Sequence, residues 1–264
     1  MIVIKIGGSL QDVDPLLSDI ARYPEPMVVV HGANRELNEL SSRLGHPPRM
    51  VTSERGEVSR FTDSLSMDHF LMAYAGKTNK RMVERLRSQG VNAVGLTAMD
   101  GGIAVGRRKP DLRVSEGGKL KVLHGDHSGS IERIEPRLLT LLLEHGYLPV
   151  LTPPAISHEG VAINVDGDRL AMEVSAALSA GRLLIFADTP GFLRDPDDPA
   201  SLVERIRGDE IDALFASARG RARVKLLAAR QALQRGIGAV GLVDGRRERP
   251  LTDALEGAGT WISA

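Results

Sequence analysis

Short apolar segments alternate with helical patterns along most of the chain, and this alternation limits its possible folds more than any other feature. The apolar segments lie at residues 2–6, 27–32, 91–97, 147–153, 182–188 and 238–243. Segments in which Leu, Met, Val and Ala recur at three- and four-residue steps lie at 34–44, 64–88, 136–145, 167–180 and 221–235. Buried strands joined by helices predict a three-layer α/β/α fold with an open, mainly parallel sheet. We expect one such domain over residues 1–264.

Residues 103–134 depart from this alternation. Four runs of β type, "IAVG", "LRV", "KLKVLHG" and "SIERI", are separated by "PD", "EGG" and "DHSG". Gly, Pro and Asp between strands are typical of tight turns. The segment is therefore predicted to form hairpins that project from the main sheet.

Charge and composition exclude several classes of function. The 34 basic and 34 acidic residues leave no net charge, so nothing global favours nucleic acid or a membrane as partner. No window approaches the roughly 18 apolar residues of a membrane span, and the chain opens on the strand-like "IVIKI", so we expect a cytoplasmic location. The chain has no cysteine, and its seven histidines lack metal-binding spacings, so no protein-bound metal is predicted.

Polar motifs follow several predicted strands, at the positions where parallel sheets bind ligands. "KIGGSL" places Lys5 within the first strand and Gly7, Gly8 and Ser9 directly after it. A lysine in an apolar strand needs an anionic partner, and two glycines let a phosphate approach the backbone. The alternative is a plain glycine turn beside a lysine at a strand edge.

Two further motifs are ambiguous when each is taken alone. "VVVHGAN" brings His31 and Gly32 to a strand-to-helix turn, which either binds an anion or simply connects two elements. "AINVDGDRLA" contains Asn164, Asp166 and Asp168 at the start of a helical pattern. This stretch fits a helix cap, a divalent-metal site or part of a catalytic centre.

The order of these motifs resembles that of the amino acid kinase family. Lys-x-Gly-Gly, His-Gly and Asn-x-Asp-x-Asp are followed by "ADTPGFL" and by Lys225 near the start of a late helix, where a solvated lysine is the alternative. The resemblance covers essentially the whole chain. It implies an α/β/α fold and an enzyme that transfers a phosphoryl group from MgATP to a carboxylate, carbamate or phosphate. It also implies acceptor binding by about residues 1–160 and ATP binding by about residues 161–264.

The resemblance implies a role for each matching residue. Lys5 and Gly8 would contact the transferred phosphoryl group. Lys225 would bind on the ATP side, and Asp168 would orient both lysines. The residues implied in acceptor binding are Gly32, Ala33, Arg60 and Asn164, and those implied in ATP binding are Gly7, Ser9, Asp188 and Gly191. Asp166 is then the helix cap, and Mg²⁺ is held chiefly by the ATP phosphates.

Two consequences follow from these roles. A carboxylate acceptor is ionised at neutral pH, so no general base is expected in the chain. Ala33 stands where most of the family has glycine. Its methyl group is expected to intrude on the reacting groups or to forbid a positive φ.

Several longer stretches closely resemble the LysW-aminoadipate kinases: "LGHPPR", "VSRFTD", "VGRRKPDLRV", "GKLKVLHGDHSGSIE" and "GYLPVLTPPA". In those enzymes the acceptor is the side-chain carboxylate of α-aminoadipate, or in some of glutamate, whose amino group is tethered to the acidic carrier LysW. The product would be an acyl phosphate of lysine or arginine biosynthesis. Two alternatives remain open: an N-acetylglutamate kinase that uses Arg60 and Asn164 for the free substrate, and a nucleotide-binding storage or sensor protein. A homodimer around the helix at 64–88 is the family's common arrangement.

The predicted hairpins carry a local charge excess. Between residues 106 and 127, six basic residues face only three acidic ones. Such a patch steers an acidic protein toward the active site. We expect the carrier to dock on Arg107, Arg108, Lys109, Lys119 and Lys121, and the alternative is a solvated hairpin whose charges only aid solubility.

Overall fold

An eight-stranded sheet forms the centre of the molecule. The computed structural model describes residues 1–264 except 55, 57, 118, 196, 218, 219 and 264, and it leaves out the side chains of 216–225. The strand order is β14-β16-β15-β13-β1-β2-β10-β5. The strands are β1 (Ile2–Ile6), β2 (Met27–His31), β5 (Ala93–Thr97), β10 (Leu148–Thr152), β13 (Arg182–Ala187), β14 (Arg205–Arg207), β15 (Ala239–Asp244) and β16 (Thr260–Ser263). Strands β15, β13, β1, β2, β10 and β5 run parallel to one another. Strand β16 pairs antiparallel with β15. The predicted mainly parallel sheet is confirmed.

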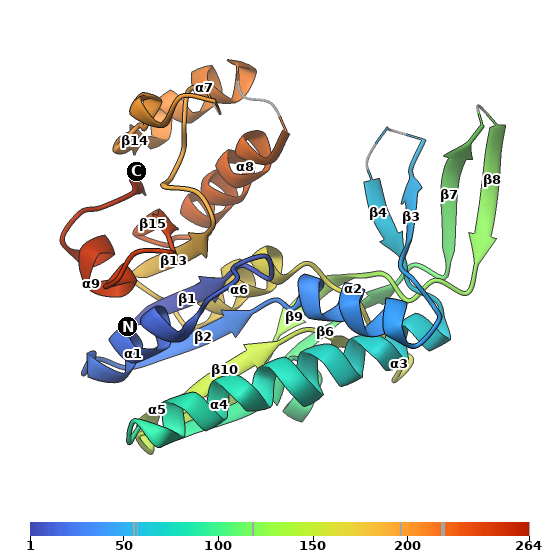
Figure 1. The fold of residues 1–264 in the computed structure, drawn as a ribbon, viewed down its shortest axis with the longest axis horizontal. Coiled ribbons are helices and arrows are strands. Elements are labelled where there is room, and N and C mark those ends of the chain that lie inside the picture. The colour runs from blue at the N-terminus through green and yellow to red at the C-terminus, as the bar shows by residue number, and fades with distance from the viewer. Residues whose placement is uncertain (55, 57, 118, 196, 218–219, 264) are drawn as a thin grey trace.

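Helices cover both faces of this sheet (Figure 1). The helices are α1 (Asp14–Arg22), α2 (Asn34–Arg43), α3 (Ser64–Leu71), α4 (Asn79–Ser88), α5 (Arg137–Glu144), α6 (Gly167–Ala177), α7 (Ile211–Ser217), α8 (Gly220–Gln234) and α9 (Pro250–Leu255), with short 3-10 turns at Asp100–Gly102, Pro199–Ser201 and Gly208–Glu210. One apolar core lies between the sheet and α1, α4 and α9, and a second lies between the sheet and α5, α6 and α8. The molecule therefore has the three predicted layers. Within the described residues, no helix is both long and apolar enough to cross a membrane.

Strand β1 places Lys5 on the face of the sheet that α6 covers. Ile2, Ile4 and Ile6 belong to the core under α1, whereas Val3 belongs to the core under α6. Successive side chains of a strand point to opposite faces. Lys5 therefore shares the face of Val3, near the amino end of α6.

Two hairpins project from the main body (Figure 1), and the chain also forms a smaller sheet. Strand β3 (Arg49–Thr52) pairs with β4 (Val58–Phe61), and β7 (Asp111–Glu116) pairs with β8 (Lys119–His124). Strands β6 (Ala104–Arg108) and β9 (Gly129–Ile134) join β11 (Ala155–Ser157) and β12 (Ala162–Ile163) in a four-stranded sheet.

The prediction for residues 103–134 is thus confirmed for β7–β8 and wrong for β6 and β9. These two strands form a sheet of their own, because β11, which lies more than twenty residues after β9, pairs with β6 and extends it. The two hairpins pack on each other through Val51, Phe61, Val114, Leu112 and Leu123.

The long helical segment predicted at 64–88 is continuous but not uniform. Between α3 and α4, residues Met72–Thr78 form a π-helix. Insertions of this kind are frequent at functional sites because they rotate side chains out of the regular α-helical positions. Tyr74 of this segment is buried and stacks on Phe70, with ring centroids 3.9 Å apart.

His31 is fully buried at the carboxyl end of β2. Its Nδ1 donates to the carbonyl oxygen of Gly32 at 3.3 Å, and its Nε2 accepts from the Asn79 side-chain amide at 3.1 Å. Burial lowers the pKa of His31 from 6.5 to about 4. The hydrogen bonds and the pKa agree, because both require a neutral imidazole.

This buried histidine predicts a loss of stability in mild acid. Because the folded-state pKa lies below the unfolded value, the unfolded chain takes up the proton first as the pH falls through 6.5 toward 4. The free energy of unfolding should fall by about 2 kcal/mol from this group between pH 7 and pH 5. Urea unfolding of wild type and His31→Gln at both pH values measures it. Equal pH dependence of the two proteins would contradict the assignment.

Candidate functional site

The centre of the site is an ion pair between Lys5 and Asp168. The Nζ atom of Lys5 lies 2.5 Å from Oδ1 of Asp168, and the two side chains are 12% and 33% exposed. An ammonium group this deeply placed requires a charged partner. Asp168 lies in the first turn of α6, where the helix dipole also favours its negative charge. The pair leaves the Lys5 ammonium held at the carboxyl edge of the sheet.

Asp166, two residues earlier, has a different task. It is the N-cap of α6, and its Oδ1 accepts from the backbone N–H of Arg169 at 2.7 Å. The predicted capping role is confirmed. Because the cap fixes where α6 begins, it also fixes the direction in which Asp168 points.

The turns after β1 and β2 touch each other through glycine. A Cβ atom on Gly8 would lie 2.8 Å from the backbone nitrogen of Asn34 and 2.9 Å from that of Ala33. Any larger residue at position 8 would therefore push the two turns apart. Helix α2 begins at Asn34, so its amino terminus opens beside Gly8 and Gly32. Two glycine turns and a helix amino terminus form a cradle of the kind that binds phosphate or carboxylate groups.

Ala33 fits this arrangement without strain. Its φ is −147°, a value that alanine adopts freely, so the expected conflict with a positive φ does not arise. Its side chain is 3% exposed and belongs to the apolar cluster of Leu37, Phe70 and Tyr74. The methyl group thus packs into the protein core, and a glycine here would leave a small gap.

Arg60 and Tyr74 lie near each other on the other side of this cradle. Arg60, on β4, donates from Nη2 to Oδ1 of Asn38 on α2 at 2.5 Å, and burial lowers the pKa of its guanidinium. Tyr74 donates its hydroxyl to Oδ1 of Asn34 at 3.0 Å. Burial raises the pKa of Tyr74 to about 12, and the nearby charge of Asp166 acts in the same direction. The cationic guanidinium of Arg60 and the neutral hydroxyl of Tyr74 therefore share one side of the site.

Asn164 is joined to the Arg60 hairpin through Thr62. The Nδ2 atom of Asn164 donates to Oγ1 of Thr62 at 3.1 Å. Contacts thus join the predicted residues in separate pairs: Lys5 with Asp168, Asn164 with Thr62, and Arg60 with Asn38. These side chains, with Asn34, Tyr74 and the two glycine turns, are called the ring below.

Sequence reasoning missed Asn34, Asn38, Thr62 and Tyr74 as members of this ring. Asn34 and Asn38 stand four residues apart on the helix that follows "HGA", a spacing that places both on one helix face. Thr62 directly follows "SRF". Tyr74 gave no signal, because its position depends on the π-helical segment.

Two of the residues predicted to bind ATP, Gly7 and Ser9, lie in the turn after β1, and two, Asp188 and Gly191, lie after β13. The N–H of Gly7 donates to the carbonyl oxygen of Phe186 at 2.9 Å, and Ser9, two residues later, is exposed. Asp188 is exposed at the end of β13. Gly191 has a packing reason to be glycine, since a Cβ there would lie 2.6 Å from Oγ1 of Thr260. Lys225 belongs to α8, but its side chain lies outside the described residues.

Asp244 and Arg246, at the end of β15, add charges near Asp188. Burial would raise the pKa of Asp244, but hydrogen bonds and the charge of Arg246 hold it below the usual value. The hydrogen bond to Asp244 raises the pKa of Arg246, and the nearby charges of Asp244 and Asp188 raise it further. The carboxyl ends of β13 and β15 thus carry a polar group of side chains.

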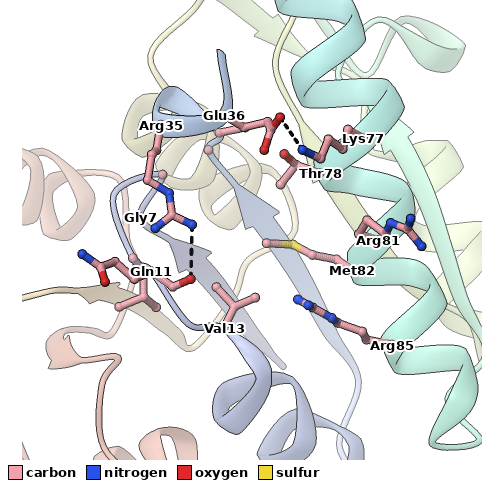
Figure 2. A pocket seen from close by; sticks show the side chains of 14 residues that line it. Gly7, Gln11, Val13, Arg35, Glu36, Lys77, Thr78, Arg81, Met82 and Arg85 are labelled. Carbon is pink, nitrogen blue, oxygen red and sulfur yellow. Dashed lines mark hydrogen bonds and ion pairs between the residues drawn. The ribbon is translucent and has the colours of Figure 1, made fainter. Parts of the chain in front are cut away.

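A cavity of about 220 Å³ lies beside the glycine turns and is lined by the segment before α1, by α2, by the π-helical segment and by α4 (Figure 2). Its lining includes the backbone of Gly8 and Gly32 but none of the ring side chains. Its basic residues already contact carbonyl or carboxylate oxygens: Arg35 with Gln11, Lys77 with Glu36, Arg81 with Glu84, and Arg85 with Asp14. The cavity therefore adjoins the ring at the glycine turns, since Gly7, Gly8, Gly32 and Ala33 line it.

The predicted docking residues occupy different parts of the β7–β8 hairpin and its root. Lys109 and Lys119 are exposed, and Lys121 pairs with Glu116 at 2.6 Å. Arg107 pairs with Glu132 at 3.1 Å and is 71% exposed. Arg108 points inward, since its Nε donates to the backbone oxygen of Asp126 at 2.7 Å.

Comparison with other proteins identifies the family of this chain. The profile of the amino acid kinase family matches residues 1–240. A [LysW]-aminoadipate kinase of Deinococcus radiodurans is 48% identical over 100% of this chain and 91% of its own length. A [LysW]-aminoadipate kinase of Thermus thermophilus is 41% identical over 99% of this chain and 100% of its own. An acetylglutamate kinase of Methanopyrus kandleri is 34% identical over 99% and 100%.

Solved structures show the same fold. An N-acetylglutamate synthase from Neisseria gonorrhoeae, complexed with coenzyme A and N-acetyl-glutamate, matches with a TM-score of 0.80 and 25% identity over 100% of this chain. The chain spans 59% of that longer protein. A carbamate kinase from Giardia lamblia bound to AMP-PNP matches with a TM-score of 0.68 and 17% identity, over 99% of this chain and 98% of its own. The family expected from the sequence motifs is confirmed, and the chain belongs to the amino acid kinase family.

Proposed function

We propose that the chain transfers the γ-phosphoryl group of ATP to the side-chain carboxylate of α-aminoadipate whose amino group is linked to the carrier LysW, with the glutamate adduct as a second acceptor. The observation that carries the proposal is the Lys5–Asp168 ion pair, 2.5 Å long, beside two glycine turns. Two full-length relatives named [LysW]-aminoadipate kinase support the choice of acceptor.

The chemistry of the transfer needs charge stabilisation and alignment rather than a base. The acceptor carboxylate is already ionised at neutral pH. Negative charge spreads over the oxygens of the transferred group, and Lys5 and the N–H groups of the glycine turns would offset it. We assign Asp168 to hold Lys5 in place, and Lys225 to the ATP side of the same group.

The two sides of the ring take the two substrates. Arg60 would pair with a carboxylate of the acceptor, and Asn164 would bind its amide-bearing end. ATP would lie over the carboxyl ends of β13 and β15, in the part of the chain after residue 160. Mg²⁺, carried in by the ATP phosphates, would neutralise part of their charge. The lysines, glycine N–H groups and helix amino terminus are donors to phosphate, which fits a cation held by the nucleotide.

The rate of acyl phosphate formation with each acceptor decides between them. Hydroxylamine traps acyl phosphates as hydroxamates, so the purified chain is given MgATP and one of three acceptors: carrier-linked aminoadipate, carrier-linked glutamate or free N-acetylglutamate. The proposal requires faster turnover of a carrier-linked acceptor. The relative named acetylglutamate kinase supports the free acceptor as the second candidate. ATP binding without acceptor-dependent ADP release would instead indicate the storage or sensor alternative.

We also propose a homodimer that pairs through the segment 64–88. Leu65 and Met72 on this segment are 48% and 54% exposed, and Leu141 is 52% exposed on α5. Exposed large apolar side chains along one helical segment supply apolar area for an interface. Sedimentation equilibrium should give about twice the mass of 28.5 kDa that one chain has.

Replacing Lys5 tests its assigned role. Lys5→Met keeps an unbranched side chain but removes the ammonium, and it should lower kcat by roughly 100-fold or more, the scale of a lost oxyanion donor. Lys77→Met is the matched control, because Lys77 also pairs with a single carboxylate, Glu36, at 2.6 Å. The control should turn over normally. Near wild-type turnover by Lys5→Met would overturn the assignment.

Reversing hairpin charges tests the docking of the carrier. Lys109→Glu/Lys119→Glu should raise KM for the carrier-linked acceptor by about three- to tenfold and weaken its salt dependence, because steering is electrostatic. The matched double variant, Arg182→Glu/Arg205→Glu, makes the same charge change on exposed residues of β13 and β14. Equal KM values for the two double variants would exclude the hairpin as the docking surface.

A further inference from the structure

Thr62 is fully buried at the point where the Arg60 hairpin returns to the body of the protein. All three of its polar groups are used. Its N–H donates to Oδ1 of Asp126 at 2.8 Å, and its carbonyl oxygen accepts from the N–H of His127 at 2.7 Å. Its Oγ1 accepts from Nδ2 of Asn164 at 3.1 Å. One residue therefore connects three segments that are far apart in the sequence.

The Asp126 side of this connection leads to the β7–β8 hairpin. Asp126 is also fully buried, and its N–H donates to the carbonyl oxygen of Pro110 at 3.0 Å. Its own carbonyl oxygen accepts from Nε of Arg108 at 2.7 Å. Asp126 thus closes the root of the hairpin on both sides. A buried carboxylate is costly unless it is hydrogen-bonded, and Oδ1 of Asp126 accepts this bond from the N–H of Thr62.

The Asn164 side leads to the acceptor residues and α6. Asn164 donates its N–H to the carbonyl oxygen of His127 at 2.8 Å and accepts from the N–H of Gly129 at 2.9 Å. Its backbone is therefore fixed by the loop that carries Asp126. Only the bond to Thr62 fixes its side-chain amide among the hydrogen bonds found in the described residues.

We propose that Thr62 is a positioning residue for acceptor recognition, which sets the side-chain amide of Asn164 relative to Arg60 and ties both to the root of the β7–β8 hairpin. This proposal rests on the proposed acceptor site. Arg60 stands two residues before Thr62 on the same strand end, so the hydroxyl of Thr62 sets the spacing of the two acceptor contacts. A carrier bound to the hairpin would then press on the same network through Asp126.

A matched pair of substitutions isolates the hydroxyl group. Thr62→Val keeps the shape but removes the acceptor for Asn164, and Thr62→Ser keeps it. Thr62→Val should raise KM for the acceptor by about tenfold, the scale of one lost side-chain hydrogen bond that leaves its partner unpaired. KM for ATP should stay within about twofold. Thr62→Ser should restore most of the acceptor affinity.

Two controls separate positioning from general damage. Thr260→Val removes another buried hydroxyl that accepts a single backbone N–H, from Phe192 at 2.8 Å, and should leave the acceptor KM unchanged. Asp126→Ala removes the acceptor of the Thr62 N–H without touching the hydroxyl, and should raise the acceptor KM in the same direction. Equal acceptor KM values for Thr62→Val and Thr62→Ser would overturn the proposal.

A readout that needs no substrate keeps this test independent of the proposed function. The side-chain amide resonances of Asn164 should shift, and their protons should exchange faster, in Thr62→Val but not in Thr62→Ser. Unmoved resonances in Thr62→Val would overturn the positioning role. A wild-type chain that turns over none of the three acceptors would overturn the proposed function, while the resonances would still decide the role of Thr62.

Discussion

The ion pair between Lys5 and Asp168 is the interaction on which the rest of the site depends. A lysine in the middle strand of a buried sheet is tolerated only with a charged partner, and its Nζ lies 2.5 Å from that partner. The strand period sets the face on which Lys5 points, and the cap at Asp166 sets where α6 begins. A shift of either element by one residue would separate the charges. The pair therefore couples the register of the sheet to the position of a helix, and in the proposed function it couples both to the phosphoryl group.

The side that we assign to the acceptor is built by long-range contacts of a different kind. Gly8 lets the turns after β1 and β2 touch, so the amino terminus of α2 opens into the site. Arg60 reaches that helix from a projecting hairpin, and Asn164 reaches the same hairpin through Thr62. In the proposed function, rigid elements thus hold the phosphoryl end, whereas two packed hairpins hold the acceptor end. This division suits a substrate attached to a protein, because the hairpins extend toward solvent where a carrier could approach.

The sequence predicted the parts of the structure that local rules control. The sheet, the need of Lys5 for an anionic partner and the cap at Asp166 follow from strand period, burial cost and helix-start chemistry, whereas Asp168 as that partner came from the family resemblance. Other features could not be read locally. The bond between Thr62 and Asn164 spans 102 residues, and the position of Tyr74 depends on a π-helical segment. Arg108 is predicted as a docking charge, whereas its Nε donates to the backbone oxygen of Asp126, a contact that the sequence does not show. Ala33 is expected from the sequence to conflict with a positive φ. Its actual φ of −147° is set by how α2 begins, which the sequence does not show.

A double-mutant cycle on Lys5 and Asp168 tests the central claim most directly. If Asp168 acts by holding Lys5, then Lys5→Met, Asp168→Asn and the double variant can be compared by kcat/KM for the carrier-linked acceptor. Residues that act as one unit have non-additive effects on rate. The double variant should be about as slow as Lys5→Met alone. Losses that simply multiply would contradict the account, because they would mean that the two residues act on the reaction independently.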